Sequence, residues 1–137
     1  MADFIAFNEG TTALANTGLP ATCHFLLSTK SVDSTTPFAV TDSLGTEDGE
    51  ITGTGYARQS QSEPTAVNGV VSFVQESWST GSATDWPANV RSVVLVTTSD
   101  DTGVMICAWN LQTGGAARDL SAANTTENVT CTLTLSD

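Results

Sequence analysis

The stretch from Asn128 to Ser136 constrains the fold more than any other part of this chain. Apolar side chains and threonines alternate there, so that each kind recurs at every second position. The apolar set is Val129, Cys131, Leu133 and Leu135, and the threonines between them are Thr130, Thr132 and Thr134. A period of two matches a β-strand, whose successive side chains point to opposite faces. The pattern therefore predicts a strand with one buried face and one face in water.

Further stretches have the composition of strands, and Gly, Pro, Asn and Asp clusters separate them. The other predicted strands are Thr22–Ser28, Gly55–Gln59, Val70–Ser77, Val90–Thr98 and Val104–Leu111. Ser99 to Gly103 supplies acids and a glycine, which favour the tight corner of a hairpin between the last two. We expect that hairpin to be central, with its core-facing residues at Val94, Val96, Ile106 and Ala108. Asn68-Gly69, ahead of Val70, is a second turn signal.

A single short helix is predicted near the amino terminus, from Asn8 to Asn16, with Asn8 as its cap and Asn16 to Gly18 as its end. Several short strands at this spacing favour a sandwich. The predicted fold class is therefore all-β, a β-sandwich or jelly-roll-like fold with one short N-terminal helix, and residues 1–137 form one domain.

The segment 31–52 is rich in Ser, Thr, Asp, Glu and Gly. A segment this polar buries little apolar surface to offset the entropy of ordering it. We expect an extended arm or loop, anchored by Phe38 and ordered chiefly by contact with a neighbouring subunit or a particle surface.

Charge narrows the range of partners. Fifteen Asp and Glu face four Lys and Arg, and the formal net charge is −11. A chain this acidic cannot neutralise phosphates by releasing counterions, which disfavours nucleic acid and anionic membranes as partners. The amino terminus lacks the basic start and long apolar stretch of a signal peptide, so we expect synthesis in a host cytoplasm.

The sequence contains few groups suited to catalysis. Cys23 and His24 are a nucleophile and a base, but neighbours on a strand point to opposite faces and cannot share a proton. The three cysteines, Cys23, Cys107 and Cys131, lie in apolar runs and are predicted to be buried thiols, with a Cys107–Cys131 bridge as the alternative. We therefore expect no enzyme, and we assign no catalytic, cofactor-binding or metal-binding residue.

Two weaker site hypotheses remain. Four acids on one loop carry oxygen ligands that suit calcium, but they lack the alternating pattern of a calcium loop, which favours a solvated acidic loop. These acids are Asp42, Glu47, Asp48 and Glu50. Trp78 and Trp86 could instead stack on a sugar ring, whereas Trp109 sits in an apolar run and is expected in the core.

From Leu27 onward the order of segments resembles small β-rich virion proteins of tailed bacteriophages, the head-decoration and tail-fibre-like group. The segments that carry the resemblance are Leu27-Ser28-Thr29, Gly53 to Arg58, Asn68 to Phe73, Ala83 to Pro87, Val93 to Val96, Gly103 to Trp109 and Ala123-Asn124-Thr125. The resemblance implies a structural role in a virion and transfers no active site.

The expected function is that of a non-enzymatic decoration protein on the outer shell of a phage capsid. Its expected partners are the major capsid protein or other virion proteins, together with copies of itself in a homotrimer. A tail or fibre component is the alternative within the same class. A carbohydrate-binding surface module that contacts a host glycan through Trp78 and Trp86 is the alternative from another class.

Overall fold

The computed structural model describes residues 4–33 and 37–134 of the chain, which fold into antiparallel strands and one α-helix. The elements, in order, are β1 (Phe4–Ala6), α1 (Asn8–Thr17), β2 (Thr22–Ser28), β3 (Gln59–Ser62), β4 (Ala66–Val67), β5 (Val70–Ser72), β6 (Glu76–Ser79), β7 (Ser92–Val96), β8 (Met105–Asn110), a short 3-10 helix η1 (Thr113–Gly115), β9 (Thr126–Val129) and β10 (Thr132–Thr134). The predicted all-β class with a short N-terminal helix is confirmed.

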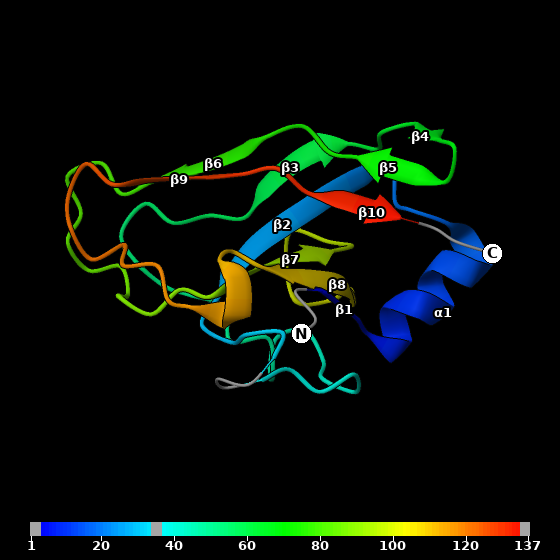
Figure 1. Ribbon diagram of the computed structural model, residues 1–137, viewed down its shortest axis with the longest axis horizontal. Helices are drawn as coiled ribbons and strands as arrows, with labels where there is room; N and C mark the ends of the chain where they lie inside the picture. The colour runs from blue at the N-terminus through cyan, green and yellow to red at the C-terminus, as the bar shows by residue number, and fades with distance from the viewer. Residues whose placement is uncertain (1–3, 34–36, 135–137) are drawn as a thin grey trace.

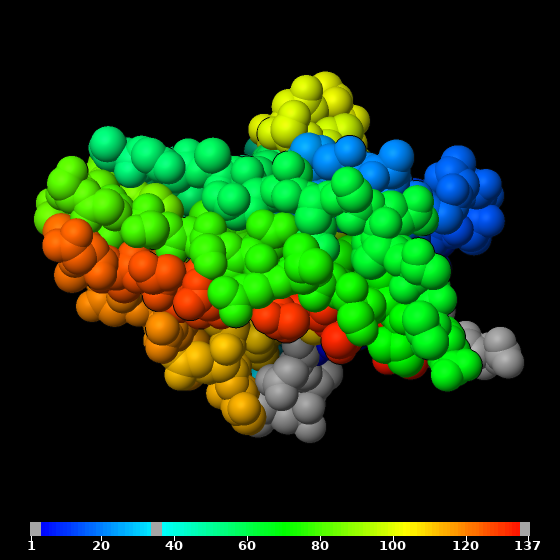
Figure 2. All heavy atoms as spheres, turned by 90° about the horizontal axis from the view of Figure 1, so that it is seen from above, coloured from blue at the N-terminus to red at the C-terminus, as the bar shows by residue number. Residues whose placement is uncertain are grey.

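The strands form two layers (Figure 1). One layer is a five-stranded sheet in the order β1-β8-β7-β2-β3. The other layer contains two short sheets placed end to end, β10-β5-β4 and β6-β9. Seen from above, β9 and β10 form one orange-to-red band beside the green band of β5 and β6 (Figure 2).

The predicted central hairpin is confirmed, since β7 and β8 pair antiparallel with Val94 opposite Ala108. All five residues of β7 are buried, because both faces of the large sheet are covered. The face toward the second layer packs in one cluster with Phe25 and Leu27, and the opposite face packs in another with Leu26. These central strands are therefore buried on both faces, unlike the one-sided strand predicted for Asn128–Ser136.

The four predicted core residues of the hairpin are all buried, but they do not share one face. Val94, Val96 and Ala108 belong to the outer cluster, whereas Ile106 belongs to the cluster between the layers. A register shift at Leu95 and Val96 changes which β8 residues face each side. A bulge of this kind leaves no clear signal in the alternation of the sequence.

Helix α1 runs from Asn8 to Thr17 and lies against β8 at one end of the sandwich, with Leu14 packed against the cluster between the layers (Figure 1). Its cap position is Phe7 rather than the predicted Asn8, which is already helical. The predicted end is confirmed, because Gly18 adopts a positive φ of 73° and its N–H donates to the Leu14 carbonyl. Gly10 is the buried contact, since a β-carbon there would lie 2.3 Å from the Cα of Ile106.

Of the two predicted forms, an extended arm or a loop, the described parts of segment 31–52 take the second, and this loop folds back over the outer face. Val32, Phe38 and Leu44 are buried in the outer cluster with Phe7. Phe38 is thus an anchor as predicted, but it packs edge-on against Phe7 of the same chain, 5.3 Å between ring centroids. A few apolar residues spaced along a polar segment are enough to hold it.

Two other strand predictions need correction. Gly55–Gln59 is largely a turn, with the Tyr56 N–H donating to the Gly53 carbonyl, and the strand β3 begins only at Gln59. Val70–Ser77 contains two strands, β5 and β6, rather than one. The Asn68-Gly69 turn is confirmed as the corner of the β4–β5 hairpin, with positive φ at both residues.

The strand predicted for Asn128–Ser136 corresponds to β9 and β10, and its final residues, Leu135 and Ser136, lie outside the described part of the chain. The alternation holds across both strands: Cys131 and Leu133 are buried, Val129 is half-buried, and the threonines between them are exposed. This strand is therefore one-sided, as the sequence predicts.

Candidate functional site

Cys23 and His24 occupy neighbouring positions on β2 and face opposite sides of the sheet. Cys23 is fully buried, and burial, with the nearby charge of Glu63, raises the pKa of its thiol to about 11. A buried thiol that stays protonated is a poor nucleophile. The pair therefore offers no activated nucleophile, which agrees with the geometric argument from the sequence.

All three cysteines are free and buried, which confirms the prediction of three buried thiols and excludes the Cys107–Cys131 bridge in this structure. Burial raises the pKa of Cys131 to about 12 and that of Cys107 well above its ordinary value. They serve as small apolar residues in the cluster between the layers.

The structure contradicts the sugar site proposed at Trp78 and Trp86. Their exposed fractions are 2% and 3%, so neither ring can stack on a ligand. Each indole N–H instead donates to a backbone carbonyl, that of Ala57 for Trp78 and that of Thr54 for Trp86. A buried indole needs such a partner for its N–H, and the flanking loops provide it.

The four loop acids do not gather into one site. Asp42 pairs with Lys30 at 2.9 Å, and Glu47 accepts the backbone N–H of Ser43. Asp48 and Glu50 do lie together, and the third carboxylate beside them is Asp101, which the sequence analysis did not select.

Arg58 supplies the positive charge for this acidic cluster. Its guanidinium makes two hydrogen bonds to Glu50, at 2.9 and 2.6 Å, and contacts Asp101 at 2.6 Å. The arginine side chain is only 7% exposed, and these carboxylates raise its pKa. Because Arg58 holds Glu50 and Asp101 together, and Asp48 accepts the backbone N–H groups of Gly45 and Glu50, this group ties neighbouring loops to one another.

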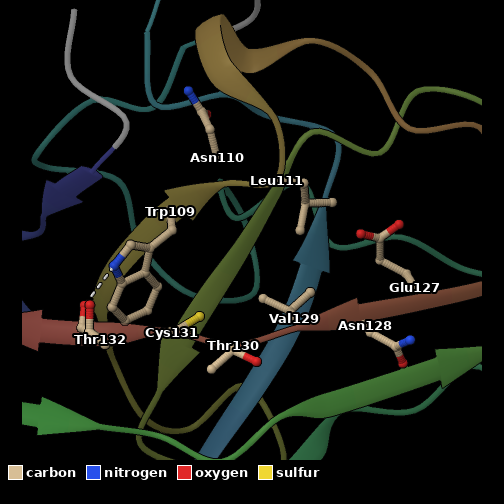
Figure 3. Close-up of a pocket in the computed structure, with 9 residues that line it drawn as sticks. All are labelled: Trp109, Asn110, Leu111, Glu127, Asn128, Val129, Thr130, Cys131 and Thr132. Carbon is tan, nitrogen blue, oxygen red and sulfur yellow. Dashed lines mark hydrogen bonds between the residues drawn. The ribbon is translucent and has the colours of Figure 1, made fainter.

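A hollow of about 360 Å³ lies at one side of the sandwich (Figure 3). One wall is the end of β8, Trp109 to Leu111, and the other is the strand segment 127–132. Trp109 is half-buried, and its indole N–H crosses the gap to the Thr132 carbonyl at 3.1 Å. A second hollow, of about 250 Å³, continues past Trp109 along Phe4, Thr132 and Thr134.

The two sides of the sandwich are joined differently, and the hollow lies on the side where β8 faces β9 and β10. On the closed side, the Gln61 amide of β3 accepts from the Val74 N–H at 2.9 Å and donates to the Val74 carbonyl at 3.0 Å. The side-chain amide of Gln61 thus bonds both backbone groups of Val74, as a residue of a neighbouring strand would, and links β3 to the second layer. On the open side, β1 and β8 face β9 and β10; the Trp109 indole N–H donates there to the Thr132 carbonyl, and Glu127 of β9 pairs with Arg118, which follows β8.

Sequence reasoning missed this site and placed Trp109 in the core. Two signals point to it in retrospect: Trp109 is the last aromatic residue before its strand ends, and the stretch from Asn128 to Thr134 contains no charge. Neither signal reveals that the two segments face each other, because that depends on how the layers close.

No family model, curated protein or solved structure matches this chain. Among the described residues, no helix is both long enough and apolar enough to cross a bilayer.

Proposed function

We propose that this chain is a non-enzymatic structural protein of a bacteriophage virion, bound to the outer shell of the capsid as a decoration protein. The proposal starts from the resemblance of its segments to small β-rich virion proteins. Its partners are then the major capsid protein and copies of the chain itself. The same acidic charge that disfavours nucleic acid keeps a protein present in many copies soluble.

The observation that carries the proposal is the kind of surface that the fold leaves available. The thiols are buried, Arg58 ties Glu50 and Asp101 together, and the open side of the sandwich presents a strand edge beside a hollow. A strand edge recognises other protein backbones, and it has no chemistry of its own. Many copies of such a contact on a particle bind tightly through effective concentration.

Quantitative mass spectrometry of purified particles tests the assignment. A decoration protein is expected in a copy number that scales with the capsomers of the shell. A handful of copies per particle would favour the alternative, a tail or fibre component. Absence from intact particles would reject the virion role altogether.

A glycan-binding role is the second candidate, and it now depends on Trp109. That tryptophan is half-buried at the rim of the hollow (Figure 3). A partly exposed indole ring is a group that can stack on a sugar. Fluorescence titration of the parent and of Trp109→Phe with host cell-wall glycans tests this role. The site is rejected if the parent shows no change in fluorescence, or if Trp109→Phe shows the same change as the parent.

A further inference from the structure

The strand that runs through β9 and β10 turns one row of backbone groups away from its neighbours. Thr80 N–H donates to the Thr125 carbonyl at 2.9 Å, and Phe73 N–H donates to the Cys131 carbonyl at 3.0 Å. Bonded pairs alternate along an antiparallel ladder, so odd-numbered residues face β5 and β6. The even-numbered residues from Thr126 to Thr134 therefore direct their N–H and C=O groups outward, as the Trp109 bond to Thr132 illustrates.

This outward row is continuous although the strand is divided in two. Val129 pairs with Glu76, and Thr132 pairs with Ser72. Moving three residues along β9 and β10 therefore corresponds to moving four residues along β6 and β5. The extra residue lies in the partner segment 73–75, and the strand from 126 to 134 keeps its alternation. The exposed edge is thus long and regular, with a hollow beside it (Figure 3).

The edge also lacks the usual features that prevent pairing. Proteins protect exposed edges with lysines, prolines, bulges or inward-pointing charges. The segment from Asn128 to Thr134 has no charged residue and no proline. Glu127, just before it, is buried and paired with Arg118 at 2.7 Å.

We propose that this edge, residues 126–134, pairs antiparallel with the same edge of a second copy. Full overlap places the two-fold axis at Thr130, so that Asn128 of one copy lies opposite Thr132 of the other. The Thr132 carbonyl, which already accepts the Trp109 indole N–H, then accepts the partner strand's N–H with its second lone pair. The two second layers then form one continuous sheet, and the partner covers the hollow beside Asn110 and Leu111.

Charge favours a second copy over a cationic partner. A cationic protein is attracted most strongly to the acid-rich surfaces, such as the Asp100-Asp101 turn, which is exposed. Two copies, each with a net charge of −11, repel one another except where the surface is neutral. The 128–134 edge is such a surface, and it is self-complementary under a two-fold axis.

Analytical ultracentrifugation of the purified chain tests the pairing, with salt as a variable. Screening shortens the repulsion from about 30 Å at 0.01 M salt to about 8 Å at 0.15 M. We expect dimers that strengthen over this range. A chain that stays monomeric at every concentration up to the millimolar range, at the higher salt, would overturn the proposal.

A matched pair of variants isolates the backbone contact. Asn128→Pro removes an outward N–H and leaves the ladder to β6 intact, whereas Asn128→Ala changes only the side chain. We expect loss of the dimer in Asn128→Pro and its retention in Asn128→Ala. A folded Asn128→Pro variant that dimerises like the parent contradicts the proposal.

Cross-linking gives an independent readout if the proline variant fails to fold. Thr130→Cys places a thiol at the proposed axis, where the paired Cα atoms come within disulfide range, and the native thiols are buried. Ala15→Cys, on the exposed side of α1, is the control. Mild oxidation is expected to link Thr130→Cys copies; equal linking in both variants, or none in either, overturns the pairing. These experiments measure the dimer without any particle. A result that rejects the dimer therefore does not by itself reject the proposed role in a virion.

Discussion

Val94 lies in the middle of β7 with no exposed surface, and its neighbours in the outer cluster are apolar. Val94→Asp would bury a charge with no partner, and we expect it to lower the free energy of unfolding by about 4 kcal/mol. Val67→Asp is the matched control, because Val67 on β4 is 65% exposed. Urea denaturation of both variants checks the prediction, and similar midpoints would contradict it.

The three thiols are expected to be unreactive in the native protein. Their raised pKa values, about 11 for Cys23 and about 12 for Cys131, keep them protonated at pH 8. A thiol reagent such as DTNB is expected to label almost none of them in buffer and all three in guanidinium chloride. Rapid labelling of one thiol in the native state would show that its strand opens locally.

At the scale of elements, the contact between α1 and β8 depends on a missing side chain. In an exposed helix, Gly→Ala stabilises by about 1 kcal/mol. Gly10→Ala is instead expected to destabilise the protein and lower its thermal midpoint. The new β-carbon would lie 2.3 Å from Ile106 Cα and 2.4 Å from the Met105 carbonyl oxygen, which is too close for both groups. Thr11→Ala, exposed in the same turn, is the control. A thermal midpoint that rises in Gly10→Ala would show that the helix does not pack this closely.

The loop over the outer face is tied at one end by Arg58, which bridges Glu50 and the Asp101 turn. Arg58→Leu is expected to loosen the loop, leaving Glu50 without its cation. Hydrogen exchange should then accelerate at the Ile51 amide, which donates to the Leu27 carbonyl, and at Thr29. The β7–β8 hairpin serves as the internal reference, and its amides are expected to stay protected.

At the scale of the whole molecule, acid is expected to destabilise the fold. Hydrogen bonds from Thr54, Thr102 and Ser121 hold the pKa of Asp85, Asp100 and Asp119, respectively, below the ordinary value of 3.8. A carboxyl group whose pKa is lower in the folded state contributes its full stabilisation of the fold at pH values above its unfolded pKa. That contribution is lost as the pH falls through the lower, folded value.

Thermal melts from pH 6 to pH 2 check this prediction. The midpoint is expected to fall mainly below about pH 4, where carboxylates protonate. Asp85→Asn, which cannot change charge, should show a shallower decline than the parent. Identical slopes would mean that the Thr54 hydrogen bonds do not contribute.

The sequence by itself determined the local structure that depends on neighbouring residues. The alternation of Cys131 and Leu133 with threonines set a one-sided strand, and Asn68-Gly69 set a hairpin turn. These signals are reliable because period and turn geometry are properties of a few consecutive residues.

Only the tertiary structure decided which faces are covered and what lies at the surface. The sequence could not place Trp78 and Trp86 in the core and Trp109 at the rim of a hollow, because the local composition points the other way: Trp109 follows an apolar run, whereas polar residues precede Trp78 and Trp86. It also missed that the loop bearing Phe38 covers the outer face and that the sandwich is open beside β9 and β10. The physical reason is that burial depends on which distant segments pack together, and that is settled by the closure of the two layers.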